Sequence, residues 1–257
     1  MATNEKFVVY WLGFHQNPPA INALPAGIDV INLFLLNLTA SANGTTLDYD
    51  YITSQGTSWD TILDQAHAAQ QNGVKVCVSM LPPNATLIWN TIPDPETFAE
   101  NVYNLVTGWG FDGIDIDPEQ GNGVIDNSTF VSVVQALSKY FGPQSGTGLI
   151  MSFASYQLFA DSPVLQPCGS LFDYVSLMGY FWSYDQMITE FDSYTQYVEA
   201  QNLLFGIGGD PWQTDLDETK QLASWEGTNG KGGMMEFNIN DDTNYQAADA
   251  IIAILGT

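Results

Sequence analysis

The chain has 257 residues and is 45% hydrophobic, which is enough to build one domain with a sizeable core. Its 29 acidic residues face only 5 basic ones, all lysine, so the formal net charge is −24. Because clustered Lys and Arg drive binding to phosphate groups, this balance argues against nucleic acid, anionic membranes and phosphorylated substrates as partners. A neutral carbohydrate fits best, and the 13% aromatic content supplies flat apolar surfaces for sugar rings.

From the N-terminus onward, short stretches rich in apolar and β-branched residues predict strands. They cover residues 7–14, 29–38, 74–80, 111–119, 149–156, 174–182, 203–207 and 232–239. Apolar residues at helical spacing predict helices between most of these strands. The predicted helices lie within residues 58–73, 98–110, 127–142, 187–200, 216–225 and 247–255. Residues 41–57 are expected to be a loop because they are polar and rich in turn-forming residues, and residues 163–169 are expected to be a short connection that starts at a proline.

Strands that alternate with helices predict a parallel sheet, and eight of them in a chain of this length predict a closed barrel. We therefore expect an α/β fold, a single (β/α)8 TIM barrel that covers residues 1–257 without an inserted domain. Active sites in such barrels lie at the carboxyl ends of the strands. Asp117 and Glu119 fall at such an end.

Acidic and apolar residues alternate along residues 111–119. In a strand, this period of two places Asp115, Asp117 and Glu119 on one face and the intervening isoleucines on the other. Three carboxylates so close together are costly in a protein interior, which favours a chemical role. A solvated strand face and a divalent-cation site remain alternatives, although the spacing does not fit an EF-hand loop.

The same stretch resembles the DxxDxDxE signature of family 18 glycoside hydrolases, with Asp112, Asp115, Asp117 and Glu119 at the four acidic positions. The resemblance implies a barrel whose fourth strand carries this signature. Adjacent carboxylates on one strand cannot easily flank a sugar from opposite sides, as ordinary retaining glycosidases require. Attack by the 2-acetamido group of the substrate resolves this difficulty, and it is the mechanism that the resemblance implies.

In that mechanism Glu119 protonates the leaving oxygen, and Asp117 orients the acetamide nitrogen and stabilises the cationic intermediate. Asp115 can share a proton with Asp117, so that the two titrate as a pair. Tyr180 matches the tyrosine of the family's Met-x-Tyr motif, which holds the acetamide oxygen, and Met178 is its methionine. Simple packing of the Tyr180 ring is the alternative.

Departures from the chitinase pattern narrow the choice within the family. The Ser-x-Gly-Gly motif after the third strand reads Ser79-Met80-Leu81-Pro82 here, and Phe237 replaces the tryptophan of the eighth strand. An aromatic followed by Asn238 resembles the endo-β-N-acetylglucosaminidases of the family. We therefore expect an endo-glycosidase that cleaves the β-1,4 bond of the N,N'-diacetylchitobiose core of N-glycans with retention.

Two other functions stay open. A small chitinase is favoured by the Met178-Gly179-Tyr180 motif, which looks more like chitinases. A silent glycan-binding lectin belongs to another class, but such lectins usually lack one of the two carboxylates corresponding to Asp117 and Glu119. The partner is in each case an N-glycan or a chitin-type oligosaccharide.

The expected substrate-binding residues share a position near strand ends or in the acidic motif. They are Asp112, Met178, Trp182, Trp212, Phe237 and Asn238, with packing an equal alternative for the two tryptophans. No metal or cofactor and no transmembrane helix is expected, and we expect a monomer. Whether Cys77 and Cys168 pair is open. Four Asn-x-Thr sequons permit a secreted origin, so we expect secretion; they start at Asn37, Asn43, Asn84 and Asn127.

Overall fold

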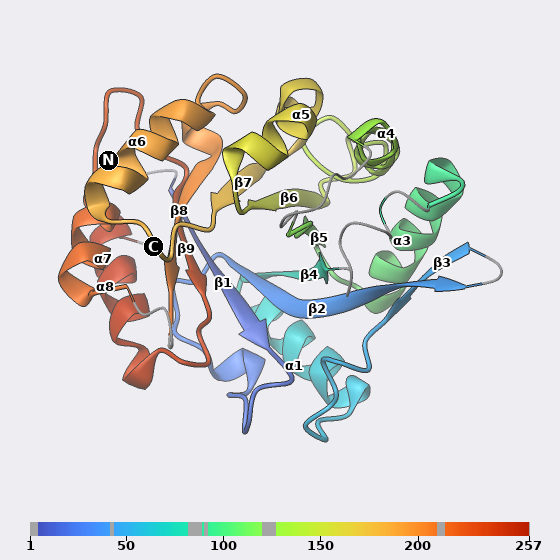
Figure 1. Cartoon of the computed structure of the whole chain (residues 1–257). Coiled ribbons are helices and arrows are strands. Elements are labelled where there is room, and N and C mark those ends of the chain that lie inside the picture. Colours follow the sequence, from blue (N-terminus) through green and yellow to red (C-terminus); the bar gives the residue numbers. More distant parts are fainter. Residues whose placement is uncertain are drawn as a thin grey trace.

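The computed structural model describes residues 5–41, 44–81, 89, 92–119, 127–209 and 214–256. Within these residues, parallel strands close into a barrel with helices around it (Figure 1). The barrel strands are β1 (Lys6–Leu12), β2 (Val30–Ser41), β4 (Lys75–Leu81), β5 (Gly113–Ile116), β6 (Ile150–Ser155), β7 (Tyr174–Leu177), β8 (Leu203–Gly208) and β9 (Gly233–Phe237). Because β1 pairs with both β2 and β9, the parallel strands form a closed ring, and the predicted (β/α)8 barrel is confirmed.

Helices follow the barrel strands on the outside. They are α1 (Trp59–Gln71), α3 (Pro95–Trp109), α4 (Asn127–Leu137), α5 (Leu158–Cys168), α6 (Tyr184–Tyr194), α7 (Leu216–Ala223) and α8 (Gln246–Leu255). Local capping fixes the ends of these helices: at the start of α1 the Ser58 hydroxyl accepts a hydrogen bond from the Thr61 N–H, and Gly110 ends α3 in the left-handed conformation. Between β1 and β2 the described helical structure is the short 3₁₀ turn η1 (Ile21–Ala23).

The polar segment 41–57 is not entirely a loop, which corrects the prediction. It contains β3 (Gly44–Asp48), which pairs antiparallel with the outer half of β2 (Figure 1). Strand β2 runs past the barrel, and its backbone groups there need a partner, which the returning chain supplies. Leu47 pairs with Leu38 and packs on the core, so this hairpin is anchored to the barrel.

The prediction of a short connection at residues 163–169 is wrong, because α5 runs through both Pro163 and Pro167. Its apolar residues do not form one stripe: Val164 and Leu165 are buried, but Phe159 is 83% exposed. Helical periodicity is therefore absent from the sequence there, and proline suggested a break.

Alternation along the strands separates two cores. Ile114 and Ile116 of β5 belong to the larger apolar cluster, between the barrel and the helices. Asp115, which lies between them in the sequence, is buried on the other side of the strand, where it contacts Tyr10 of the interior cluster. A smaller cluster fills the barrel interior and includes Val8, Tyr10, Leu12, Val30, Phe34, Cys77, Ala154, Tyr174, Met178, Leu204 and Met235. Gly113 lets β5 approach β6, because a Cβ there would lie 2.3 Å from the Ile150 carbonyl oxygen.

Both cysteines are free and buried, Cys77 in the interior cluster and Cys168 in the outer one, so they do not pair. In the described part of the chain, no helix is both long and apolar enough to cross a membrane.

Candidate active site

A pocket of about 320 Å³ opens at the carboxyl ends of the barrel strands. Its lining combines carboxylates with aromatic and sulfur-containing side chains: Asp117, Glu119, Tyr156, Met178, Tyr180, Phe181 and Phe237. Asp117, Glu119, Met178, Tyr180 and Phe237 are residues that the sequence pattern had singled out. The structure thus brings together the carboxylates after β5 with side chains that follow β7 and end β9.

The acidic stretch is a strand for only part of its length. Strand β5 ends at Ile116, although the Asp117 N–H still donates to the Met80 carbonyl of β4 at 3.1 Å. Glu119 has a φ of 36°, in the left-handed region, so the backbone has turned away from the strand direction. The predicted single row of three carboxylates is therefore corrected: Asp117 and Glu119 meet in the pocket through a turn.

Asp115 lies below the pocket, inside the barrel. Its carboxylate accepts three hydroxyl hydrogen bonds, from Tyr10 at 2.7 Å, Ser79 at 2.8 Å and Ser152 at 2.7 Å. Burial raises the pKa of Asp115, and these three donors act in the opposite direction. An acceptor surrounded by donors is suited to the ionised form, so we assign the negative charge of this region to Asp115.

Asp117 is buried and lines the pocket. Its pKa is raised well above the ordinary value, first by burial and then by the charges of Glu119, Asp115 and Asp161. One of its carboxyl oxygens, Oδ1, has no hydrogen-bond partner within the described structure. Asp117 therefore holds a proton more readily than Asp115 and keeps one oxygen ready for a ligand.

Glu119 lies closer to solvent than Asp117, and burial raises its pKa too. A glutamate with a raised pKa retains a proton at higher pH and can serve as a general acid. Its position in the same pocket as the unpaired Asp117 oxygen places an acid and an acceptor around one ligand.

The aromatic wall of the pocket is formed by Tyr180 and Phe237. Their rings stack with centroids 5.6 Å apart and an angle of 19° between planes. Burial, with the nearby charges of Asp117 and Glu119, raises the pKa of Tyr180 well above its ordinary value. Its hydroxyl therefore stays protonated and can donate a hydrogen bond; its contact in the structure is the Met235 sulfur, at 3.8 Å.

Two aromatic residues at the rim were missed by sequence reasoning. Tyr156 directly follows β6 and is 37% exposed, and Phe181 follows Tyr180 and is 55% exposed. A sequence signal for Tyr156 exists: it ends a predicted barrel strand, which is where such a fold places its active site.

Asp112 is not in the pocket, which corrects its predicted substrate-binding role. It precedes β5 at the amino end of the barrel, where its carboxylate accepts hydrogen bonds from the Val76 N–H at 2.9 Å and Gln70 at 2.6 Å. It also forms an ion pair with Lys75 at 2.8 Å. Its role is to fix the start of β4 and β5, at the end of the barrel away from the pocket.

Two other predicted binding residues, Asn238 and Trp182, are not among the described residues that line the pocket. Asn238 is buried and forms a reciprocal pair with Asp241, donating to its carboxylate at 2.9 Å and accepting from its N–H at 3.2 Å. Trp182 packs against the outer core, next to Gly179. Trp212 lies outside the described residues.

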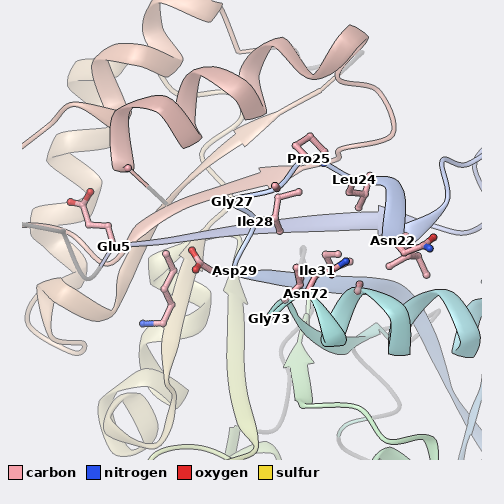
Figure 2. Close-up of a pocket in the computed structure, with 16 residues that line it drawn as sticks. Glu5, Asn22, Leu24, Pro25, Gly27, Ile28, Asp29, Ile31, Asn72 and Gly73 are labelled. Carbon is pink, nitrogen blue, oxygen red and sulfur yellow. The ribbon is translucent and has the colours of Figure 1, made fainter.

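No cluster of three or more His, Cys, Asp or Glu side chains within the described ranges is arranged to hold a metal. A larger cavity of about 890 Å³ lies at the other end of the barrel, between the connection from β1 to β2 and the end of α1 (Figure 2). Its acidic residues are Glu5 and Asp29, and Asp29 is engaged by the Phe7 N–H at 2.7 Å. The smaller pocket is the candidate active site because it holds the two carboxyl groups of Asp117 and Glu119 and the aromatic wall.

The chain resembles known proteins over most of its length. The family model described as the endo-beta-N-acetylglucosaminidase EndoS TIM-barrel domain matches residues 7–236. Endo-beta-N-acetylglucosaminidase F2 of Elizabethkingia meningoseptica is 25% identical over 245 residues, which cover 88% of this chain and 68% of the relative. An endo-beta-N-acetylglucosaminidase of Bifidobacterium longum subsp. infantis is 26% identical, covering 86% of this chain but only 44% of the relative.

Solved structures share the fold. An endo-beta-N-acetylglucosaminidase from Cordyceps militaris superposes with a TM-score of 0.77 at 21% identity, covering 98% of this chain and 91% of that one. A putative chitinase A from Streptomyces coelicolor gives 0.80 at 17% identity, covering 98% and 99%. Both kinds of enzyme are therefore built on this barrel.

Proposed function

Because the chain belongs to the family of the endo-β-N-acetylglucosaminidase EndoS TIM-barrel domain and is a glycoside hydrolase, we propose that it cleaves the core of N-glycans. The bond cleaved is the β-1,4 bond between the two N-acetylglucosamines of the N,N'-diacetylchitobiose unit. Both matching relatives carry the name of this activity, and neither is a chitinase.

The reaction proceeds in two steps, and the substrate's own 2-acetamido group is the nucleophile of the first. Its carbonyl oxygen attacks C1 while the bond from C1 to the leaving oxygen breaks, and Glu119 gives its proton to that oxygen. Water then attacks C1 of the oxazolinium-type intermediate while the bond from C1 to the acetamide oxygen breaks, and ionised Glu119 takes the proton from water, which restores the 2-acetamido group and the acid form of Glu119. Two inversions at C1 give net retention.

Asp117 acts on the acetamide nitrogen. Its unpaired oxygen accepts a hydrogen bond from the acetamide N–H, which turns the carbonyl oxygen toward C1. One negative charge, shared with Asp115, lies beside the cationic intermediate and stabilises it. Tyr180 supplies a protonated hydroxyl at the same wall of the pocket.

The observation that carries this proposal is the unpaired, buried Asp117 oxygen in one pocket with Glu119. A buried acceptor without a partner is costly and gains the most from a ligand that donates to it. The N–H of a 2-acetamido group is such a donor. A sugar with a hydroxyl at C2 has no amide N–H to donate to the Asp117 oxygen.

A chitinase is the second candidate, because chitin-type oligomers carry the same acetamide. The shared fold with chitinases and the Met178-Gly179-Tyr180 motif favour it. Secretion and a monomeric state remain predictions from the sequence alone.

Mass spectrometry separates the candidates. A high-mannose glycoprotein and a chitin oligomer are each incubated with wild type and with Glu119→Gln. Release of the glycan by wild type alone, leaving one N-acetylglucosamine on asparagine, is the expected result. Cleavage of the chitin oligomer alone would identify a chitinase, and binding without cleavage of either would contradict the enzymatic proposal.

A further inference from the structure

Two carboxylates bracket strand β6, one at each end. At the amino end, Asp173 accepts a hydrogen bond from the Met151 N–H at 2.9 Å. At the carboxyl end, a single oxygen of Asp161 accepts from the Ser155 hydroxyl at 2.5 Å, the Tyr156 N–H at 3.1 Å and the Gln157 N–H at 3.3 Å. Asp161 is 1% exposed and forms no ion pair within the described residues.

The hydrogen bonds at Asp161 continue to the next helix. The Ser155 hydroxyl lies 2.7 Å from the Tyr194 hydroxyl of α6. Because Ser155 has one proton, which it donates to Asp161, Tyr194 is the donor to Ser155. The hydrogen bonds therefore run in one direction, from Tyr194 on α6 through Ser155, the last residue of β6, to the Asp161 carboxylate on α5.

This network holds the backbone just where the chain enters the pocket. Ser155 is the last residue of β6, and Tyr156 is the first residue after it. The Tyr156 side chain lines the pocket with Asp117 and Glu119, and its N–H is one of the three donors to Asp161. The backbone N–H of Tyr156, whose ring lines the pocket, is therefore hydrogen-bonded directly to the buried Asp161 carboxylate.

We propose that Asp161 is a positioning residue, which fixes the exit of β6 so that the Tyr156 ring forms a wall of the pocket against the bound sugar. This inference rests on the proposed function of the pocket. It assigns Tyr156 as a substrate contact and Asp161 as the residue that places it.

Charge supports the same assignment. The charge of Asp161 is one cause of the raised pKa of Asp117, so it acts on the site electrostatically as well as through the backbone. Burial raises the pKa of Asp161 itself to about 6, with its hydrogen bonds opposing the shift. Burial makes the charged form of Asp161 costly, and no cation among the described residues forms an ion pair with it. Such a carboxylate is retained more readily because it positions neighbouring groups than because it stabilises the fold.

A double-mutant cycle tests the proposal. Asp161→Asn, Tyr156→Ala and the double variant are compared in kcat and KM on the substrate that wild type cleaves. Asp161→Asn is expected to lower kcat/KM about tenfold, the equivalent of one hydrogen bond to a charged group, mostly through KM. In the Tyr156→Ala background, the same substitution is expected to have a much smaller effect, because only the loss of the Asp161 charge near Asp117 remains.

Asp173→Asn is the matched control, because it removes the equivalent carboxylate from the other end of the same strand. It is expected to lower the unfolding temperature without changing kcat/KM. Additive losses in the double variant, or an equal kinetic loss in Asp173→Asn, would overturn the positioning role.

The same cycle is repeated on binding, in a Glu119→Gln background, by calorimetry with a chitin-type oligosaccharide. This keeps the inference separate from the proposed reaction. If wild type is inactive but Asp161→Asn still weakens binding about tenfold through Tyr156, positioning holds and the proposed reaction fails. If binding is unchanged in every variant, the positioning role is wrong.

Discussion

Tyr10 of β1 and Asp115 of β5, 105 positions apart in the sequence, are joined by a 2.7 Å hydrogen bond inside the barrel. The bond exists because closure of the barrel brings together interior side chains of strands that are not neighbours in the sheet. It supports an ionised Asp115 directly beneath Asp117, and the charge of Asp115 contributes to the raised pKa of Asp117. The proton arrangement in the pocket therefore depends on a residue from the first strand.

Tyr10→Phe is expected to raise the pKa of Asp115, because it removes a donor that stabilises the anion. If the Asp115 and Asp117 pair must keep one negative charge, the acid limb of the kcat/KM profile moves to higher pH. Ser152→Ala removes another donor to the same carboxylate and should shift the limb in the same direction. Profiles that stay in place in both variants would contradict an ionised Asp115.

Asp117→Asn is expected to reduce kcat by roughly 10² to 10³, with a much smaller effect on binding. Asparagine can still contact the acetamide, but it carries no negative charge when the intermediate becomes cationic. Steady-state kinetics, with binding of a chitin-type oligosaccharide measured by calorimetry, separates the two effects. Equal losses in kcat and affinity would show that Asp117 acts on the ground state instead.

The alkaline limb of the kcat/KM profile is assigned to Glu119. Its pKa is raised by burial, so the acid form persists to higher pH than in an exposed glutamate, and activity falls as pH rises through that pKa. An aryl glycoside with an acidic phenol as leaving group needs little help from an acid. Its rate should therefore be less sensitive to Glu119 and lose much of the alkaline limb. The same limb for both kinds of substrate would assign it to another group.

Asp112→Ala is expected to destabilise the fold without affecting catalysis. The substitution leaves the Val76 N–H without its acceptor and breaks the contacts with Gln70 and Lys75, which should cost about 2 kcal/mol in unfolding free energy. Thermal unfolding and kcat/KM are measured on the same preparation. A large loss of kcat/KM at temperatures where the variant is fully folded would restore a role in substrate binding.

The sequence predicts those parts of the structure that depend on local periodicity. Strand and helix alternation gives the barrel, and the alternation around Asp115 correctly separates the buried acidic side chain from Ile114 and Ile116. It fails where local signals compete with tertiary contacts. Proline suggested a break in α5, and the polar composition of residues 41–57 concealed a strand that forms only because β2 is there to pair with it.

The site shows the same division. Asp117, Glu119 and Tyr180 meet because each follows a barrel strand, which sequence position already implies. Asp112 belongs to the same acidic motif but lies at the opposite end of the strand, so a motif alone does not place every member at the site. No sequence pattern predicts the hydrogen bonds of Asp161. They depend on α5, whose sequence has no helical periodicity, and on Tyr194 of α6.

A change in the substrate tests whether cleavage is assisted by the substrate's acetamide through Glu119 and Asp117. Wild-type enzyme is assayed on two matched chitobiose-type glycosides. One carries the natural 2-acetamido group on the sugar whose C1 is attacked, and the other carries a hydroxyl at that position. We expect wild type to turn over only the first glycoside, and to cleave the second no faster than Glu119→Gln cleaves the natural substrate. Comparable turnover of both by wild type would contradict assistance by the acetamide, because the nucleophile would then have to come from the protein or from water.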